Sequence, residues 1–319
     1  MSKLINSNII IAPMAGITNN AFLKLLSKLG AKVAIKEMIS DNALNYGSLK
    51  SLEMLKKESI PNMTIGIQLF GSSELSMTKA AIYIDKHSDY DFIDINMGCP
   101  VPKITKQKAG ASLMLDEELA VRIVASIIRN VKKPVSVKMR LGYNSQNINC
   151  LSLARKLEAI GVFMITIHAR TRADMYGGSL LYEEVLKVKK ALKIPVVVNG
   201  DIKSLDDYKR LKELGFNKMM IGRALVAKPY LVSQLEAYEK NEEIKEIKPE
   251  FAMQLMRDHF LNLIELKGEK MACLEFRGIA AYYLNGFKNA TKYKRELVKI
   301  NSKADFLKII DEIIADSKI

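Results

Sequence analysis

The chain has 319 residues, of which 49% are apolar and 26% charged, a composition typical of a globular protein with one large domain and a small one. It contains no run of about eighteen apolar residues, so no membrane-spanning helix is expected. Its cysteines, Cys99, Cys150 and Cys273, lie far apart without a Cys-x-x-Cys pair, which argues against a disulfide framework and against a metal site.

Lysine and arginine outnumber aspartate and glutamate by 49 to 35, which leaves a formal net charge of +14. Such an excess attracts polyanions and makes RNA or DNA a candidate partner. Codon bias toward A and T is the alternative, since lysine, isoleucine and asparagine are abundant and tryptophan is absent. The first residues lack an apolar signal core with a cleavage site, so we expect a cytoplasmic protein.

Short apolar, β-branched runs alternate along the chain with segments of helical periodicity. Leu23, Leu26 and Leu29, for example, recur at helical spacing between the first two runs. The sequence predicts strands at residues 9–11, 33–35, 63–67, 92–95, 135–138, 163–167, 196–198 and 219–221.

Apolar strands that are each followed by a helix indicate a parallel sheet covered on both faces. Eight such units in roughly 230 residues match an α/β fold of the closed (β/α)8 type, a TIM barrel, which we expect here. An open doubly wound sheet is the alternative. It would carry a Gly-x-Gly-x-x-Gly turn after its first strand, where this chain has Ala12-Pro13-Met14-Ala15-Gly16 instead.

A charged segment follows the last predicted barrel helix and ends at Pro249, which can begin a new helix. Beyond it, apolar residues such as Leu255 and Phe260 recur at helical spacing and no strand pattern occurs. We therefore expect a barrel domain at residues 1–244 and a small C-terminal all-helical domain at residues 245–319.

In a (β/α)8 barrel the active site lies at the C-terminal ends of the strands, so polar residues after the apolar runs should share one pocket. Loops after strands seven and eight often bind phosphate through backbone N–H groups, with tight turning as the alternative role for their glycines. The residues at the strand ends are Pro13, Met14, Ala15, Gln68, Asn96, Cys99, Lys138, Arg140, His168, Arg170, Asn199, Gly200, Asp201, Gly222 and Arg223.

Cys99 follows the fourth predicted strand, in Asn96-Met97-Gly98-Cys99-Pro100. Gly98 permits unusual backbone angles and Pro100 restricts the residue before it, so the thiol should point in a fixed direction. We interpret Cys99 as a proton donor or nucleophile. A small apolar residue at a strand end is the alternative.

Lys138 ends an apolar strand, where a cation needs a partner, so we expect it to contact an anionic ligand. A Schiff-base lysine and a lysine that reaches the surface are the alternatives. His168 is one of three histidines, and its position at a strand end favours ligand binding over a structural role.

Seven segments, in order along most of the chain, resemble the motif set of the tRNA-dihydrouridine synthases. They are Ala12-Pro13-Met14-Ala15-Gly16, Gln68-Leu69-Phe70-Gly71, Asp94-Ile95-Asn96-Met97-Gly98-Cys99-Pro100, Lys138-Met139-Arg140, His168-Ala169-Arg170-Thr171-Arg172, Asn199-Gly200-Asp201 and Ile221-Gly222-Arg223. The resemblance implies an FMN-dependent barrel with a helical RNA-binding tail, which reduces the C5–C6 double bond of particular uridines in tRNA with NADPH.

The resemblance also implies roles for several residues of these segments. Cys99 would give a proton to C5 of the uracil while a hydride passes from flavin N5 to C6, and Asn96 would hold the uracil. Thiols are mostly protonated at neutral pH, as this role requires. Lys138 would stabilise the anionic reduced flavin. FMN would be bound by Pro13, Met14, Ala15, Gln68, Lys138 and His168, and its phosphate by Asn199, Gly200, Asp201, Gly222 and Arg223.

A uridine in folded RNA must turn outward before it can stack on a flavin, and contacts to the RNA backbone must offset that cost. Between residues 288 and 303 there are six cations and one acid, which suits a phosphate track, although a solvated helix face is the alternative. The candidate RNA contacts are Lys103, Arg140, Arg170, Arg277, Lys292 and Lys294. We expect a monomer.

Two positions depart from the family pattern. Gly278 follows Arg277 where the family usually has lysine, and Ala224 follows Arg223 where a glycine is common. Two other functions stay open: a flavin barrel acting on a free pyrimidine, such as a dihydroorotate dehydrogenase, and a non-catalytic RNA-binding protein on a barrel scaffold. The basic helical tail would have no purpose in the first, and the second would purify without colour.

Overall fold

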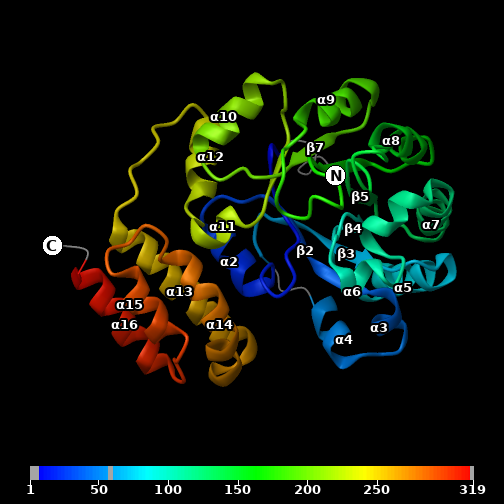
Figure 1. Cartoon of the computed structure of the whole chain (residues 1–319). Helices are drawn as coiled ribbons and strands as arrows, with labels where there is room; N and C mark the ends of the chain where they lie inside the picture. Colours follow the sequence, from blue (N-terminus) through cyan, green and yellow to red (C-terminus); the bar gives the residue numbers. More distant parts are fainter. Residues whose placement is uncertain (1–6, 57–59, 317–319) are drawn as a thin grey trace.

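The computed structural model describes residues 7–56 and 60–316, and within them eight parallel strands close a barrel in chain order (Figure 1). The predicted TIM barrel is confirmed. The strands are β1 (Ile9–Ile11), β2 (Val33–Ser40), β3 (Thr64–Phe70), β4 (Phe92–Met97), β5 (Val135–Arg140), β6 (Met164–His168), β7 (Val196–Asn199) and β8 (Met219–Ile221).

Several strands extend beyond the limits predicted from their apolar runs. β1 and β8 match the predicted limits. β2 runs to Ser40, beyond its predicted end at residue 35, and β3 to β7 continue through polar residues, namely Gln68, Asn96, Arg140, His168 and Asn199. A side chain that points into the barrel does not interrupt the pairing of the backbone, so a polar residue can stand inside a strand.

Helices cover the outside of the barrel, and several begin at a residue whose side chain accepts a backbone hydrogen bond, such as Asn19, Ser73, Asp116 and Ser204. The helices are α2 (Asn20–Lys28), α3 (Asp41–Asn45), α4 (Leu49–Leu55), α5 (Glu74–His87), α6 (Pro102–Thr105), the 3-10 helix η1 (Gly110–Leu115), α7 (Glu117–Asn130), α8 (Cys150–Ala159), α9 (Tyr182–Ala191), α10 (Leu205–Glu213), α11 (Ala224–Ala227) and α12 (Leu231–Glu239).

The inside of the barrel changes from apolar to polar along its axis. Ile10, Val33, Phe92 and Met164 pack together toward the N-terminal ends of the strands. Gly66 leaves room there for the ring of Phe92, because a Cβ atom at this position would lie 2.3 Å from that ring. The polar candidates occupy the inward positions nearer the C-terminal ends, so they face the mouth.

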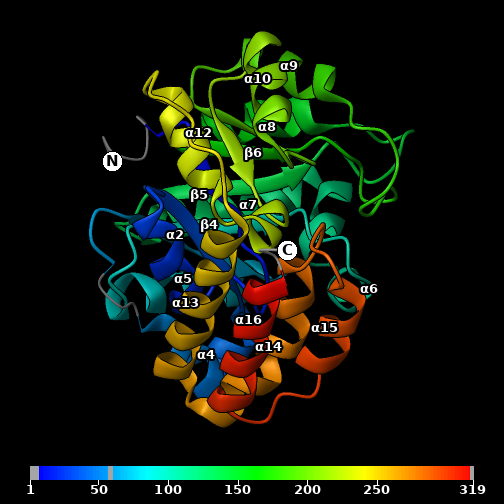
Figure 2. The ribbon, with the colours of Figure 1, turned by 90° about the vertical axis from the view of Figure 1, so that its left-hand side faces the viewer.

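Four further helices form the tail, which lies beside α2 and α11 in Figure 1 and is turned toward the viewer in Figure 2. They are α13 (Pro249–Lys267), α14 (Glu269–Tyr283), α15 (Ala290–Leu297) and α16 (Lys303–Asp316). Phe260, Phe276 and Phe306 form an aromatic core, with ring centroids 4.1 to 5.4 Å apart. The helical character predicted for the end of the chain is therefore confirmed over residues 249–316.

The tail packs directly on the barrel. Ala21 of α2 belongs to the tail's apolar core, and its carbonyl oxygen accepts a hydrogen bond from Asn262 Nδ2 at 3.2 Å. The rings of Phe22 and His259 lie 4.9 Å apart. Met14, after β1, packs against both the barrel core and the tail core. The tail therefore borders the barrel mouth.

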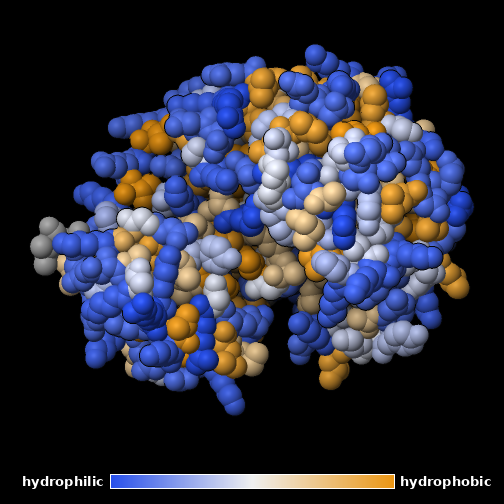
Figure 3. Space-filling view, viewed as in Figure 1, coloured by the Kyte–Doolittle hydropathy of each residue, from blue (hydrophilic) through white to orange (hydrophobic). Residues whose placement is uncertain are grey.

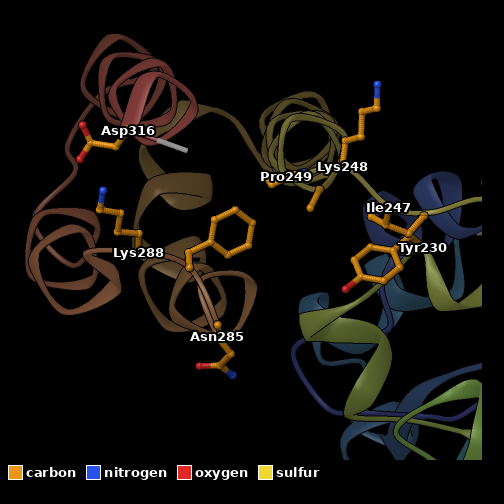
Figure 4. A pocket seen from close by; sticks show the side chains of 10 residues that line it. Tyr230, Ile247, Lys248, Pro249, Asn285, Lys288 and Asp316 are labelled. Carbon is orange, nitrogen blue, oxygen red and sulfur yellow. The ribbon is translucent and has the colours of Figure 1, made fainter. Parts of the chain in front are cut away.

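A hollow with hydrophobic residues in its depth opens between the tail and the barrel (Figure 3). A cleft of about 310 Å³ lies where the connection to α13 meets the end of the tail. Tyr230 and Ile247 line one side of this cleft, and Asn285, Lys288 and Asp316 the other (Figure 4). None of the candidate residues at the barrel mouth lines it.

Across residues 7–56 and 60–316, no helix is both long and apolar enough to cross a membrane. The same residues include no group of three or more histidine, cysteine or acidic side chains placed to hold a metal ion.

Candidate active site

Cys99 lies half-buried on the turn after β4 and is a free cysteine. Asn96 Oδ1 accepts hydrogen bonds from the backbone N–H groups of Gly98 and Cys99, at 3.1 and 2.9 Å. Arg140 Nε donates to the Gly98 carbonyl at 2.8 Å, and the Ala111 N–H donates to the Cys99 carbonyl at 3.1 Å. Both N–H groups and carbonyl groups of the turn are therefore held by hydrogen bonds.

A series of buried hydrogen bonds lies below this turn, and Asn96 is the side chain of the series that contacts the turn. Asn96 Nδ2 donates to Gln68 Oε1 at 2.7 Å, and Gln68 Nε2 donates to Asp94 Oδ2 at 2.7 Å. Ser136 Oγ donates to the other oxygen of Asp94 at 2.6 Å. Burial raises the pKa of Asp94 to about 6, although these two hydrogen bonds and the charge of Lys138 act in the opposite sense.

Lys138 and His168 point toward the same space from neighbouring strands. Burial, followed by the charge of Arg140, lowers the pKa of Lys138 to about 8, and its Nζ makes no hydrogen bond with the described residues. Burial and then the charges of Lys138, Arg140 and Arg170 lower the pKa of His168 to about 2. The imidazole is therefore neutral at physiological pH, and its Nε2 is buried without a partner among the described residues.

The turn after β7 brings an acid among cations. Asp201 accepts a hydrogen bond from Arg170 Nη2 at 2.8 Å and lies 3.1 Å from Arg223 Nη2 and 3.4 Å from Lys203 Nζ. The hydrogen bond from Arg170 lowers the pKa of Asp201 to about 2. A carboxylate repels phosphate, so Asp201 can serve a phosphate only by orienting these guanidinium groups.

The two glycine turns approach their neighbours closely. Gly200 has φ +135°, and a Cβ atom there would lie 2.7 Å from Leu180. A Cβ atom at Gly222 would lie 3.3 Å from Ala12 and 3.5 Å from the sulfur of Met14. Beside Gly200, Asn199 Nδ2 donates to the Met220 carbonyl at 2.8 Å, which links β7 to β8.

The loop after β1 forms one wall of the mouth. Pro13 and Met14 are half-buried and Ala15 is exposed. Thr18 Oγ1 holds this loop, because it donates to the Ala12 carbonyl at 2.9 Å and accepts from the Met14 N–H at 3.0 Å. The loop is thus fixed with its small and apolar side chains toward the space beside Gly222.

The mouth fits a flavin mononucleotide. Two buried nitrogen atoms there, His168 Nε2 and Arg170 Nη1, have no hydrogen-bond partner among the described residues, and the charge of Lys138 acts on the same imidazole. A guanidinium group can bind a phosphate, and an ammonium group can donate to ring carbonyls. The free nitrogen of a neutral imidazole can donate or accept one hydrogen bond. The apolar loop at Pro13 and Met14 offers a surface for a flat ring.

The candidate RNA contacts at the mouth differ in exposure. Lys103, on α6, is exposed. Arg140 is 2% exposed, and besides Gly98 it binds the Thr171 carbonyl through Nη1 at 2.6 Å. Arg170 is 4% exposed and binds Asp201. The structure therefore leaves Lys103 free to reach a large ligand, whereas the two arginines contact the loops of the mouth.

The candidates in the tail also separate into two kinds. Arg277 donates from Nε and Nη2 to the Ile300 carbonyl at 3.1 and 2.8 Å, which joins α14 to the end of α15. Lys292 is exposed, and Lys294 donates to Asn285 Oδ1 at 2.8 Å. Only the lysines of α15 thus present cations mainly to solvent.

Three residues that sequence analysis gave no role belong to the site. Asp94 and Ser136 support the Asn96 amide from below, and the signal for Asp94 was its two-residue spacing from Asn96 along one strand. Tyr176 is 48% exposed, with its ring centroid 5.9 Å from Arg140 Cζ and 4.9 Å from Arg223 Cζ. Its loop has no regular pattern that would have marked it.

Comparisons with known proteins agree with this arrangement. The family model described as dihydrouridine synthase matches residues 10–318. A probable tRNA-dihydrouridine synthase of Rickettsia bellii is 32% identical over 312 residues, which cover 97% of this chain and 94% of the relative. The tRNA-dihydrouridine synthase B of Vibrio vulnificus is 31% identical, with coverage of 93% and 92%.

Solved structures share the fold at low sequence identity. A 2-naphthoyl-CoA reductase superimposes with a TM-score of 0.58 at 12% identity, over 75% of this chain and 50% of the reductase. Morphinone reductase in complex with tetrahydroNAD superimposes with a TM-score of 0.53 at 11% identity, over 77% of this chain and 90% of that enzyme. These likenesses concern the barrel alone. On the strength of the family match and of relatives that align along almost its whole length, the chain belongs to the dihydrouridine synthase family.

Proposed function

We propose that this chain reduces the C5–C6 double bond of uridines in tRNA, with FMN as bound cofactor and NADPH as reductant. Family membership supports this proposal, as do relatives named tRNA-dihydrouridine synthases. The observation that carries it is a partly accessible thiol, Cys99, on a turn held by Asn96 and Arg140 at a barrel mouth whose free polar nitrogens fit FMN.

FMN, when bound, supplies the hydride that reaches C6 of the uracil. Lys138 gives positive charge beside the cofactor, and His168 gives a neutral hydrogen-bonding nitrogen. Arg170 and Arg223, oriented by Asp201, bind the phosphate together with the backbone around Gly200 and Gly222. Pro13, Met14, Ala15, Gln68 and Asn199 complete the cofactor-binding set.

Cys99 donates the proton that C5 of the uracil requires, from Sγ in its thiol form. Asn96 holds Gly98 and Cys99 through Oδ1. Its amide nitrogen donates to Gln68 Oε1 and, at 3.4 Å, to the sulfur of Met38, so a uracil would take the place of the weak contact with sulfur. Arg140 acts on the same turn from the carbonyl of Gly98. These contacts keep the thiol directed at one place in the mouth.

The RNA is bound by cations of both parts of the chain. Lys103 lies next to the mouth, and Lys292 and Lys294 lie on α15. Arg140 and Arg170 support the loops of the mouth, and Arg277 supports the segment after α15. In this proposal residues 1–244 form the catalytic domain and residues 245–319 the tRNA-binding domain. The protein acts in the cytoplasm as a monomer, without a metal ion.

The decisive experiment replaces Cys99 with alanine. The purified wild-type protein should be yellow, and Cys99→Ala should keep its FMN and its oxidation of NADPH. Dihydrouridine formation on tRNA, measured by mass spectrometry of nucleosides, should fall by roughly a hundredfold or more because the general acid is lost.

Cys273→Ala is the matched control, since this cysteine is buried in the tail core and its loss should leave turnover within about twofold. Full activity of Cys99→Ala on tRNA would sink the proposed role of the thiol. A colourless wild-type protein would sink the proposed cofactor.

A further inference from the structure

The hydrogen bonds below Cys99 run in one direction, from the backbone of the turn to a carboxylate. The turn donates to Asn96, Asn96 donates to Gln68, and Gln68 donates to Asp94. The exposed fractions of these three side chains are 6%, 2% and 0%. Because this series of hydrogen bonds is buried, water does not compete for its donors and acceptors.

The two ends of this chain determine how both amides are turned. A backbone N–H group can only donate a hydrogen bond, and an ionised carboxylate can only accept one. Reversal of the Gln68 or the Asn96 amide would place donor against donor or acceptor against acceptor at each of its ends. Asn96 therefore presents its oxygen to Cys99 because Asp94 attracts Gln68 Nε2.

Strand pairing holds the acid at the base of the chain. Gln68 of β3 pairs with Asp94 of β4, and Asp94 pairs with Ser136 of β5, so three inward side chains lie side by side. Ser136 Oγ binds the second carboxylate oxygen at 2.6 Å, and Lys138 follows two residues later on the same face.

Folding alone does not account for this acid. A fully buried carboxylate costs free energy that an apolar side chain of similar size would not. Among the described residues, Asp94 is the acceptor at the lower end of these hydrogen bonds, farthest from the turn. It therefore determines which way the amide groups of Gln68 and Asn96 are turned.

We propose that Asp94, held by Ser136, is a positioning residue for Cys99, which it acts on through Gln68 and Asn96. Its carboxylate keeps the Asn96 oxygen under the N–H groups of Gly98 and Cys99 and thereby directs the thiol. The catalytic meaning of this role rests on the proposed function, in which Cys99 is the proton donor.

The first test is the hydrogen exchange of the Gly98 and Cys99 amides in the full-length holoenzyme, followed by NMR. In Asp94→Leu these two amides should exchange faster by roughly tenfold, since Asn96 is free to reverse. Asp94→Asn should keep their protection within about twofold, because its oxygen can accept from Gln68 while its NH2 donates to Ser136 Oγ. If Asp94→Leu acted only by loosening the packing, Asp94→Asn would not be expected to restore the protection of these two amides.

The second test is turnover on tRNA. Asp94→Leu should lower kcat by roughly tenfold and leave KM for tRNA unchanged, and Asp94→Asn should restore most of kcat. Ser136→Ala removes one contact of Asp94 and should raise the exchange of both amides by about threefold, which keeps the proposal testable if Asp94→Leu does not fold.

Glu236→Leu is the control for losing a buried acid. Glu236 is 7% exposed and pairs with Lys32, which precedes β2 at the other end of the barrel. It should lower stability without changing exchange at Gly98 and Cys99.

Unchanged exchange at these amides in both Asp94→Leu and Ser136→Ala would overturn the positioning role. If exchange accelerates as expected but Cys99→Ala still forms dihydrouridine at the wild-type rate, the positioning role stands and the proposed function of the thiol fails.

Discussion

Gly110 lies directly against Cys99, at the start of η1. It has φ +60°, and a Cβ atom there would lie 2.8 Å from the Cys99 carbonyl oxygen and 3.2 Å from Cys99 Cβ. Gly110→Ala should therefore displace the turn that carries the thiol. We expect tRNA turnover to fall by roughly tenfold while FMN content, measured by absorbance, stays unchanged.

Gly161→Ala is the matched control for that substitution. Gly161 has φ +98°, and the nearest atom to its added Cβ would be 4.0 Å away, on Ile128. Both variants should lose about 1 kcal/mol of stability through backbone strain, but only Gly110→Ala should lose turnover. Equal turnover of the two variants would show that contact with Gly110 does not position Cys99.

Asp94 should also give the free energy of unfolding a distinct pH dependence. Burial raises its pKa from 3.8 to about 6, so the folded chain binds this proton more tightly than the unfolded chain does. Its contribution is thus greatest below pH 4 and is lost as the pH rises through 6. Relative to Asp94→Asn, the wild type should gain about 2.4 kcal/mol between pH 7 and pH 4.

Denaturant titrations of the two proteins across this pH range measure the effect. A constant difference in unfolding free energy between wild type and Asp94→Asn would mean that Asp94 has no raised pKa in the folded protein.

At the scale of the element, α15 carries two of the candidate RNA contacts, the exposed Lys292 and the half-exposed Lys294. In Lys292→Glu with Lys294→Glu, affinity for tRNA should fall and the slope of log affinity against log salt should become shallower, because fewer counterions are released. Filter binding at several salt concentrations measures both quantities, and flavin content should not change.

Lys190→Glu with Lys193→Glu makes the same change of charge on and just after α9, on the outside of the barrel. Affinity lost equally in both double variants would indicate a general effect of net charge. Affinity lost in neither would return the lysines of α15 to a solvated helix face.

At the scale of the whole molecule, the tail and the barrel share an apolar interface. Ala21 of α2 and Val226 of α11 belong to the same buried cluster as the tail core around Phe276. Helices that bury their apolar faces against one another unfold together, so the chain should show one cooperative thermal transition.

The absence of tryptophan makes this measurable, because Tyr282→Trp places a single tryptophan on the exposed side of α14, which can be excited selectively at about 295 nm or above. Its fluorescence and the release of flavin should change at the same temperature within about 2 °C. Phe276→Ala should lower both midpoints together, since such a cavity costs about 3–5 kcal/mol. Two separate transitions would mean that the tail is stable on its own.

The pattern of residues was sufficient for the fold, and it predicted a site at the C-terminal ends of the strands. Apolar runs and helical spacing are local properties of the chain, and they predicted all eight strands and the helical tail. The predicted ends of β2 to β7 came too early, because an apolar run ends at a polar residue although the strand continues through it. Inward polar residues such as Gln68 and Asn96 were therefore found but placed after the strands.

The partners of the polar residues depended on distances between strands, which no local pattern contains. The sequence identified Gln68 and Asn96 as ligand contacts, and only the pairing of β3, β4 and β5 shows that they also join Asp94 to the Cys99 turn. Arg140 and Arg277 likewise bind backbone carbonyls that are far away along the chain. Residue types and their spacing thus decided which chemistry this protein can perform. The closure of the barrel decided which atoms hold the reactive thiol, because hydrogen bonds depend on geometry at the scale of about 3 Å.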